Sequence, residues 1–447
     1  MFGKMLVLLL LLVFASVPVA AVLGILSLSL DQTELGGRLA LGMGDFVWDK
    51  SKEFLLVAVP MFIMLGEIMV RSGIAQRMYN AVAYWLSWLP GGLMHANIGS
   101  CAIFAASSGS SVATAATVGV VAEPEIARRR YNEPLFLGSL AAGSTLGILI
   151  PPSVNLILYG LITDTSVPEL YLAGILPGLL LAGLFMLIIA AACLYRRDWG
   201  GERTPVSWTQ RLNSLPDLLP PVLLFIAVIG SIYAGLATPT EAASLGVCCA
   251  LLIAAWKKSL NLKMLAAAFE GTMRTTAMIM LIILAAGFLN SVLGFIGITQ
   301  ALTDYIAALG LTFMQTMLII VVFYLILGMF METLSMMLTT VPLIFAIVTG
   351  LPGFDPVWGP VWFGILVIVL METALITPPI GVNLYVVQGI RSKGSFNDVA
   401  LGALPFLAMM LVMVALLLLF PQIATWLPEQ FYCNPTDSAA ALRCPSP

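Results

Sequence analysis

The chain has 447 residues, of which 60% are hydrophobic and 10% are charged. Soluble domains carry about 25% charged residues, and a soluble globule of this size could not bury so much apolar surface. The sequence therefore predicts an integral membrane protein rich in apolar helices. A net charge of −3 without a basic tract argues against nucleic acid as a partner. One histidine and six scattered cysteines argue against a zinc or iron–sulfur centre.

The first 30 residues resemble a secretory signal peptide, because Lys4 precedes an apolar run that small residues follow. The apolar stretch continues through Leu30, however, which gives about 26 residues, enough to span a membrane with some tilt. We therefore expect a retained helix. Windows with at most one charge predict further spans at roughly 54–70, 134–163, 170–194, 218–237, 240–256, 275–296, 360–390 and 399–427.

Two further apolar stretches, 92–122 and 312–347, carry small or polar residues at their middles. Each predicts a re-entrant hairpin, because a non-helical tip is tolerated inside the membrane only against protein or a water-filled cavity. Lysine and arginine then orient the chain. If the N-terminus is cytoplasmic, only four of the 20 basic residues face outward: Arg38, Lys50, Lys52 and Arg443. We therefore expect a cytoplasmic N-terminus and, after nine crossings, a C-terminus outside.

Two segments of the chain resemble each other. Residues 150–156 read Ile-Pro-Pro-Ser-Val-Asn-Leu, and residues 377–384 read Thr-Pro-Pro-Ile-Gly-Val-Asn-Leu. Each proline pair removes two helix donors and pushes the preceding residue out of the helical region. A simple proline kink is the alternative interpretation of either copy. Because both copies have matching sequels, we expect the helices at 134–163 and 360–390 to be broken near mid-membrane.

The elements pair into two halves, each ordered as span, span, amphipathic segment, hairpin, broken span and span. Residues 1–217 form the first repeat, residues 238–427 form the second, and one linking helix at 218–237 inverts the second relative to the first; residues 428–447 form a tail. The predicted fold is an all-α polytopic membrane protein with an inverted-topology repeat in a 5+1+5 arrangement, two re-entrant hairpins and two broken helices. Such repeats are typical of secondary transporters.

Polar groups gather at both hairpin tips and both breaks. The first tip reads Ser107-Ser108-Gly109-Ser110-Ser111 and stands against the break at Pro151. The second tip, Gly328–Ser335, stands against the break at Thr373–Asn383. Hydroxyls and freed carbonyls suit a dehydrated Na⁺, whereas helix N-termini and hydroxyl donors suit an anionic substrate. Two alternative interpretations stay open. The small residues serve helix packing alone, or the hydroxyl groups bind a polyol substrate.

The candidate substrate-binding residues lie at these tips and breaks: Ser108, Ser110, Ser111, Ser153, Asn155, Glu332, Ser335 and Asn383. Among the carboxylates in apolar windows, Glu332 is a candidate ion-site or cavity residue. Glu372 is either functional or a structural hydrogen-bond partner. Glu67 lies within one turn of Arg71 and predicts a local ion pair. Walker, GxSxG and HExxH motifs are absent from the sequence, so we expect neither ATP hydrolysis nor another enzymatic activity.

The segment Thr238-Pro239-Thr240-Glu241-Ala242-Ala243, taken with both proline pairs, resembles the large membrane subunit of a tripartite ATP-independent periplasmic (TRAP) transporter. This family includes bacterial C4-dicarboxylate and sialic acid systems. Further similar stretches cover nearly the whole chain: Val59–Glu67, Pro90–Gly92, Ser107–Ser111, Leu172–Gly178, Asp355–Trp358 and Leu375–Pro379. One departure follows the first tip, where many relatives have Ala-Asp-Ala and this chain has Ala113-Thr114-Ala115, so the family's substrate preference is in doubt here.

The resemblance implies a Na⁺-driven elevator transporter of the bacterial inner membrane that uses no ATP. It implies two protein partners, namely a separate small four-helix membrane subunit and a periplasmic solute-binding protein that delivers a small organic anion. Glu241 is implied at a partner interface, with helix capping as the alternative. The implied Na⁺ ligands lie at the two tips and the two breaks: Ser107, Ser108, Gly109, Thr145, Gly147, Ile150, Pro151, Gly328, Thr333, Thr373, Thr377 and Pro378.

Three function classes stay open at this point. The first is Na⁺-coupled import of a small carboxylate handed over by a periplasmic binding protein. The second is a stand-alone Na⁺- or H⁺-coupled anion transporter, and the third is a channel, which the paired broken helices disfavour. On the periplasmic side of this topology, Cys433 and Cys444 enclose a short segment and predict a disulfide.

Overall fold

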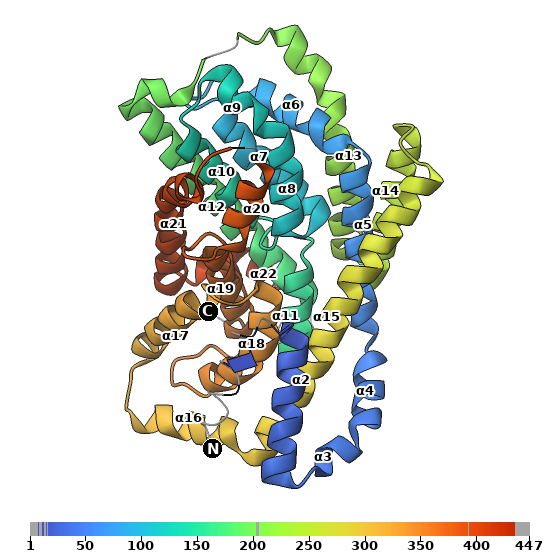
Figure 1. The fold of residues 1–447 in the computed structure, drawn as a ribbon, viewed down its shortest axis with the longest axis vertical. Coiled ribbons are helices and arrows are strands. Elements are labelled where there is room, and N and C mark those ends of the chain that lie inside the picture. The colour runs from blue at the N-terminus through green and yellow to red at the C-terminus, as the bar shows by residue number, and fades with distance from the viewer. Residues whose placement is uncertain are drawn as a thin grey trace.

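The structure, a computed structural model, describes residues 17–202, 205–391 and 393–433, together with positions 8, 11, 12 and 15. Within this part of the chain the regular elements are all helices (Figure 1). Six of the described helices are long and apolar enough to cross a membrane, and five shorter apolar helices accompany them. The predicted all-helical, polytopic membrane fold is confirmed.

The N-terminal region leads to the first hairpin. Most of the predicted first span falls on residues outside the described ranges, and its described helix α2 has 12 residues, too few to span alone. Asp31 is buried just after α2, and its carboxylate accepts hydrogen bonds from the main-chain N–H groups of Leu39 (3.1 Å) and Ala40 (2.8 Å). The elements here are α2 (Val19–Leu30), η1 (Asp31–Leu35), α3 (Arg38–Leu41), α4 (Met43–Ser51), η2 (Phe54–Val57), α5 (Ala58–Arg71) and α6 (Ile74–Leu86).

The first hairpin and the first broken helix follow. Gly109 turns the hairpin with a φ of 59°, a left-handed conformation that glycine adopts without strain. The broken helix is interrupted over residues 146–153, around Pro151 and Pro152. These elements are α7 (Leu93–Ser108), α8 (Ser111–Ala122), α9 (Pro124–Arg129), α10 (Glu133–Thr145) and α11 (Val154–Thr163).

Long helices join the two halves. Three of them, α12, α13 and α15, exceed 25 residues and are long enough to extend beyond a ~30 Å hydrocarbon core. Figure 1 shows α15 running obliquely along much of the molecule. The elements are α12 (Val167–Tyr195), η3 (Arg197–Gly200), α13 (Trp208–Tyr233), α14 (Pro239–Trp256), α15 (Leu262–Ile296) and α16 (Ile298–Ala308).

The second half repeats the hairpin and the broken helix. The second tip lies at residues 329–332, and the second break lies at residues 376–381 around Pro378 and Pro379. Figure 1 places α7 and α8 in the upper half of the molecule and α17 and α18 in the lower half, as an inverted repeat requires. The elements are α17 (Phe313–Gly328), α18 (Thr333–Thr349), α19 (Gly359–Leu375), α20 (Val382–Ile390), α21 (Phe396–Leu419) and α22 (Gln422–Tyr432).

The two halves interlock at the level of the breaks. Helix α11, beyond the first break, packs against α18 of the second hairpin, and α20, beyond the second break, packs against α8 of the first. Helices α10 and α21 approach still more closely, because a Cβ atom on Gly138 would lie only 1.9 Å from the carbonyl oxygen of Gly402. The two glycines therefore let helices of the two repeats pack in direct contact within one core.

Some predicted boundaries are wrong. The linking helix begins at Trp208 rather than at 218, because Ser207 and Gln210 form a capping box there. The predicted span at 399–427 is two helices, since Phe420 and Pro421 end α21. Helix α22 thus continues five residues into the predicted tail; Cys433 at its end is disulfide-bonded, and Cys444 lies outside the described residues.

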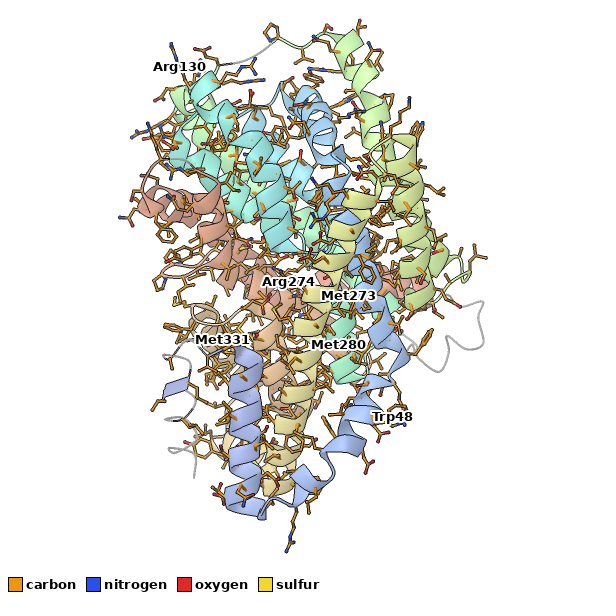
Figure 2. The ribbon with its side chains drawn as sticks, turned by 45° about the vertical axis from the view of Figure 1, so that its right-hand side comes forward. Trp48, Arg130, Met273, Arg274, Met280 and Met331 are labelled. Atoms are coloured by element: carbon orange, nitrogen blue, oxygen red, sulfur yellow. The ribbon has the colours of Figure 1, made fainter. Side chains whose placement is uncertain are left out.

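Arg274 also differs from the expectation. The sequence places it at the cytoplasmic edge of a span that begins at 275. The helix α15 instead begins at Leu262, capped by Asn261, so Arg274 lies about a third of the way along it. Figure 2 shows Arg274 near mid-height, between Arg130 at one end of the molecule and Trp48 towards the other. Its guanidinium pairs with the exposed carboxylate of Glu270 at 3.6 Å.

Candidate functional site

The first tip contacts the first break directly. The hydroxyl of Ser111 donates to the carbonyl oxygen of Thr145 at 3.2 Å. A Cβ atom on Gly147 would lie 3.0 Å from the carbonyl carbon and oxygen of Ser110, and one on Gly109 would lie 3.3 Å from the carbonyl oxygen of Pro152. The structure therefore brings together the tip and break residues that the sequence predicts as one site.

One serine of the first tip and one serine of the first break cap helices, but they differ in exposure. Ser110 caps α8 by accepting from the Ala113 N–H at 3.4 Å, and it stays partly exposed. Ser153 is fully buried; it caps α11 and donates its own hydroxyl to the carbonyl oxygen of Ile148 at 2.6 Å. Ser153, predicted to bind substrate, is thus engaged within the break, whereas Ser110 lies at an accessible helix N-terminus.

The second tip is capped by a carboxylate. Glu332 accepts hydrogen bonds from the Ser335 N–H (3.1 Å), the Ser335 hydroxyl (3.3 Å) and the Thr333 hydroxyl (3.2 Å). A negative charge at a helix N-terminus is stabilised by the unpaired N–H groups and by the helix dipole. Glu332, Thr333 and Ser335 therefore form one hydrogen-bonded cap at the start of α18.

Gly328 fixes the distance between the second tip and the second broken helix. A Cβ atom at this position would lie 2.2 Å from the Cβ atom of Ala374, one residue before the end of α19. The two threonines of the break donate to carbonyls one turn back, Thr373 to Val369 (2.7 Å) and Thr377 to Thr373 (2.6 Å). Their hydroxyl oxygens keep free lone pairs, which a cation could use.

The two breaks meet through Asn383. Its side-chain nitrogen donates to the Ser144 hydroxyl at 2.9 Å, although the two residues are 239 positions apart. Its Oδ1 atom is buried without a hydrogen-bond partner among the described residues, as is the Nδ2 atom of Asn155. The predicted residues Asn155 and Asn383 therefore each keep a side-chain atom that could still form a hydrogen bond. Ser144 was not among the predicted site residues, and only its place at the end of α10 could have suggested it.

The remaining predicted residues are placed as follows. The side chains of Ser107 and Ser108 lie outside what the structure describes. Thr145 contributes its main-chain oxygen, while its hydroxyl donates to Ala142 at 2.8 Å. The hydroxyl of Thr114 donates to the Ser110 carbonyl at 2.7 Å. The other three form the breaks themselves: Ile150 and Pro151 in the first and Pro378 in the second.

Two carboxylates outside the tips have local partners. Glu67 pairs with Arg71 at 2.9 Å, which confirms the predicted ion pair. Glu241 closes a capping box by accepting from the N–H and the hydroxyl of Thr238, both at 2.8 Å. The alternative interpretation, helix capping, is therefore confirmed with Thr238 as the cap, and a further role of Glu241 at a partner interface stays a prediction.

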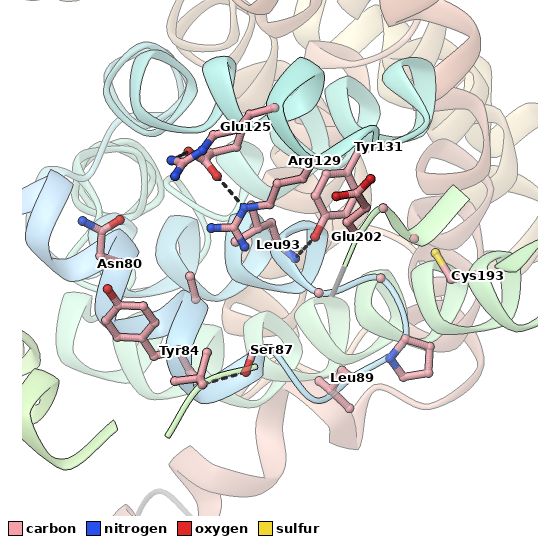
Figure 3. Close-up of a pocket in the computed structure, with 18 of the residues that line it drawn as sticks. Asn80, Tyr84, Ser87, Leu89, Leu93, Glu125, Arg129, Tyr131, Cys193 and Glu202 are labelled. Carbon is pink, nitrogen blue, oxygen red and sulfur yellow. Dashed lines mark hydrogen bonds and ion pairs between the residues drawn. The ribbon is translucent and has the colours of Figure 1, made fainter. Parts of the chain in front are cut away.

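A cavity of about 790 Å³ lies elsewhere. It is bordered by α6, α9 and the start of α7, and none of the predicted site residues lines it. Figure 3 shows Glu125 facing Arg129 (2.6 Å) and the Tyr131 hydroxyl accepting from the Leu93 N–H (3.0 Å). Burial raises the pKa of Tyr131, so its hydroxyl stays protonated at neutral pH.

Comparisons with known proteins agree with this architecture. The chain is 33% identical over 395 residues to the C4-dicarboxylate TRAP transporter large permease protein DctM of Rhodobacter capsulatus, covering 85% of this chain and 88% of that protein. It is 31% identical to the sialic acid large permease SiaM of Vibrio cholerae (85% and 87% covered) and 32% identical to the ectoine large permease TeaC of Halomonas elongata (84% and 86% covered).

The fold also has a solved counterpart. The crystal structure of the YdaH transporter of Alcanivorax borkumensis matches 95% of this chain and 98% of that chain, with a TM-score of 0.57 and 16% identity. The sequence profile described as "Tripartite ATP-independent periplasmic transporter, DctM component" matches residues 6–423. The protein is thus a membrane transporter component rather than an enzyme, and it belongs to the DctM component family of tripartite ATP-independent periplasmic transporters.

Proposed function

We propose that this chain performs Na⁺-coupled import of a small organic anion across the bacterial inner membrane. The observation that carries the proposal is the contact of each hairpin tip with a broken helix, joined across the repeats by Asn383 and Ser144. Such sites offer main-chain and hydroxyl oxygens, which suit Na⁺, beside helix N-termini, which suit anions. The two hairpins and broken helices form the mobile part of an elevator.

The anion is assigned to the first tip rather than to the second. The N-terminus of α18 is already occupied by the Glu332 carboxylate, which would repel a second negative charge. The N-terminus of α8 carries only the neutral cap of Ser110. The relatives' names mention C4-dicarboxylates, sialic acid and ectoine, so substrates of this size and polarity are the ones to assay first.

Membership of the family supports two partners: a small membrane subunit and a periplasmic binding protein that delivers the substrate. The charge pattern supports an N-terminus in the cytoplasm and a C-terminus in the periplasm. Arg128, Arg129 and Arg130 then lie on the cytoplasmic side, at the end of the molecule that α9 occupies (Figure 1).

The test is uptake into proteoliposomes that contain the chain, its co-encoded small subunit and its co-encoded binding protein. Succinate, sialic acid and ectoine are the first radiolabelled probes. We expect uptake of one of these small solutes only when all three components are present. Uptake by the purified chain alone would instead support a stand-alone anion transporter.

A further inference from the structure

The cavity at the base of the first hairpin is separate from the tips and the breaks. Its volume is about 790 Å³, and its walls come from α6, the end of α8, α9, the end of α12 and the start of α13, together with the loop before α7. Figure 3 shows Asn80 and Tyr84 on the α6 wall and Glu125 and Arg129 on the α9 wall. A polar cavity of this size, formed by several elements, is a candidate ligand site.

Two glycine pairs hold the walls in place around Tyr131. Gly92 precedes α7 with a φ of 44°, and Gly201 follows η3 with a φ of 63°. A Cβ atom on Gly92 would lie 2.7 Å from the Tyr131 hydroxyl, and one on Gly201 would lie 2.9 Å from the Tyr131 ring. A Cβ atom on Gly200 would lie 3.4 Å from the main-chain nitrogen of Gly91. Both loops therefore pack closely on one side chain, so the cavity is built into the fold.

The walls carry more positive than negative charge. Both carboxylates that line the cavity are already paired. Glu125 accepts from Arg128 at 3.0 Å and from Arg129 at 2.6 Å, and Glu202 pairs with Arg130 at 3.5 Å. Three guanidinium groups therefore serve two carboxylates, which leaves one positive charge in excess.

Arg197 adds a further positive charge to the lining. None of the ion pairs found among the described residues includes it. Its neighbour Arg196 does not line the cavity and stacks over the Trp199 ring at 5.1 Å. At the N-terminus of α7, the Leu93 N–H donates to the neutral Tyr131 hydroxyl, and no carboxylate caps that helix end. Guanidinium groups and the positive end of a helix dipole both favour an anion.

Exposed aromatic side chains surround the mouth of the cavity. Trp88, Tyr195 and Trp208 are exposed, and each lies within two positions of a residue that lines the cavity. Tryptophan and tyrosine are enriched where lipid headgroups meet water. Leu194 lines the cavity and is itself exposed, so the mouth offers apolar surface beside the polar walls. This pattern fits a ligand that has a negatively charged head and apolar tails.

We propose that this cavity binds the phosphate-bearing headgroup of an anionic phospholipid, with Arg197, Arg128 and Arg129 as its cationic contacts. A phosphate offers several oxygen acceptors to guanidinium donors, and the acyl chains would extend over the apolar side chains at the mouth. A bound headgroup would connect η3 with α9, the helix at the base of the first hairpin. The inference does not depend on the proposed Na⁺ coupling, because transport without Na⁺ would leave it unchanged.

The first test is native mass spectrometry of the purified complex of the chain and its small subunit, titrated with phosphatidylglycerol in detergent. Arg197→Gln removes a charge that lines the cavity, and Arg196→Gln, the matched control, removes the neighbouring charge outside it. We expect Arg197→Gln to weaken the tightest phosphatidylglycerol binding about tenfold and Arg196→Gln to change it less than about twofold. Equal losses in the two variants, wild-type affinity in Arg197→Gln, or equally tight binding of zwitterionic phosphatidylcholine would overturn the inference.

A second measurement leaves every arginine of the cavity in place. In a background without Cys248 and Cys249, Asn80→Cys places a thiol on the α6 wall, and Arg77→Cys places an exposed thiol on the same helix outside the cavity. We expect nanodiscs of phosphatidylglycerol to slow the reaction of Asn80→Cys with N-ethylmaleimide, relative to nanodiscs of phosphatidylcholine, and to leave the rate of Arg77→Cys unchanged. Equal rates for Asn80→Cys in the two lipids would contradict a headgroup in the cavity.

Glycerol 3-phosphate distinguishes a lipid from a soluble phosphate compound, since it has the head chemistry without the acyl chains. Added to Asn80→Cys in phosphatidylcholine nanodiscs, it should protect the thiol far less than phosphatidylglycerol does. Protection equal to that by phosphatidylglycerol would assign the cavity to a soluble phosphate compound and overturn the lipid assignment.

Discussion

At the scale of single residues, hydrogen bonding separates the polar groups of the core into two sets. Ser153 and Glu332 have their hydrogen bonds inside the protein and define where helices begin. Asn155 and Asn383 keep polar atoms that no described residue satisfies. Buried polar groups are nearly always satisfied in folded proteins, so the second set supports the binding site proposed at the tips and breaks.

Glu332 provides a prediction about stability. Replacing Glu332 with Ala removes the cap of α18 and should lower the free energy of unfolding by about 1 kcal/mol, the usual value for loss of an N-cap. Glu332→Asp should retain most of the stability, because Asp is a favourable cap. Thermal unfolding of the two purified variants in detergent measures the difference. Equal midpoints for Glu332→Ala and wild type would show that the cap contributes nothing.

Some of these residues could be read from the sequence, and others could not. The glycine at the first tip and the prolines at the breaks indicate where helices end, because glycine adopts a left-handed φ without strain and proline lacks the main-chain N–H that a helix needs. The partner of Asn383 could not be predicted, since Ser144 is 239 positions away and its contact depends on how two helices cross. The complete burial of Glu372 likewise depends on its neighbours and not on its own identity.

At the scale of elements, small residues set how closely each tip approaches its broken helix. Replacing Gly328 with Ala should push α17 away from α19 and cost about 1–3 kcal/mol, because the new Cβ atom would lie 2.2 Å from that of Ala374. Adding Ala374→Gly to this variant should restore stability and uptake. Gly183→Ala in α12 is the control, since no atom lies within 4 Å of a Cβ atom there. If Gly328→Ala behaves like Gly183→Ala, the contact has no energetic importance.

Arg391 ties three helices together beyond the second break. Its side chain is 2% exposed, and its guanidinium pairs with Glu133 at the start of α10 and with Asp398 at the start of α21. It also donates to the Gln388 side chain (3.0 Å) and to the Ser395 carbonyl (3.1 Å). The ends of α10, α20 and α21 are therefore fixed relative to one another by one buried cation.

Loss of this cation should destabilise the protein. Arg391→Ala leaves two carboxylates that water can still reach, so we expect a loss of about 1–3 kcal/mol rather than the larger cost of an isolated buried charge. Lys52→Ala is the comparison, because its pair with Asp49 is exposed on both sides and should contribute much less to stability. Thermal unfolding of both variants in the same detergent gives the answer; equal effects would mean that burial of Arg391 does not matter.

The sequence predicted elements better than their ends. Hydrophobic windows and proline pairs located the hairpins and breaks. In the membrane, main-chain polar groups must form hydrogen bonds within a helix or lie against protein, so interruptions are few and recognisable. The boundaries at Trp208 and Leu262 were missed, since caps by Ser207 and Asn261 extend α13 and α15 beyond their apolar windows. Hydropathy does not detect such caps.

At the scale of the whole molecule, the orientation in the membrane is the first claim to check. In a background without the native Cys248 and Cys249, Lys52→Cys should react with a membrane-impermeant maleimide on intact spheroplasts. Arg128→Cys should react only after the membrane is permeabilised. Both positions are well exposed, so accessibility to the reagent depends on the side of the membrane. The reverse pattern would invert the topology and exchange the entry sides of the two hairpins.

The interlocking of the repeats gives the molecule its central property. Because α11 packs on α18 and α20 packs on α8, both breaks and both hairpins belong to one packed unit. In the proposed function a cation binds to main-chain and hydroxyl oxygens of that unit, and a cation gradient would drive net import. Coupling to Na⁺ is therefore the claim on which the account depends.

The most direct measurement is uptake into proteoliposomes with the complete transporter under imposed gradients. An inward Na⁺ gradient should drive accumulation of the solute, a K⁺ gradient of equal size should not, and a Na⁺ ionophore should abolish the effect. Accumulation that is equal in Na⁺ and K⁺, or that follows an imposed proton gradient in the absence of Na⁺, would contradict the account.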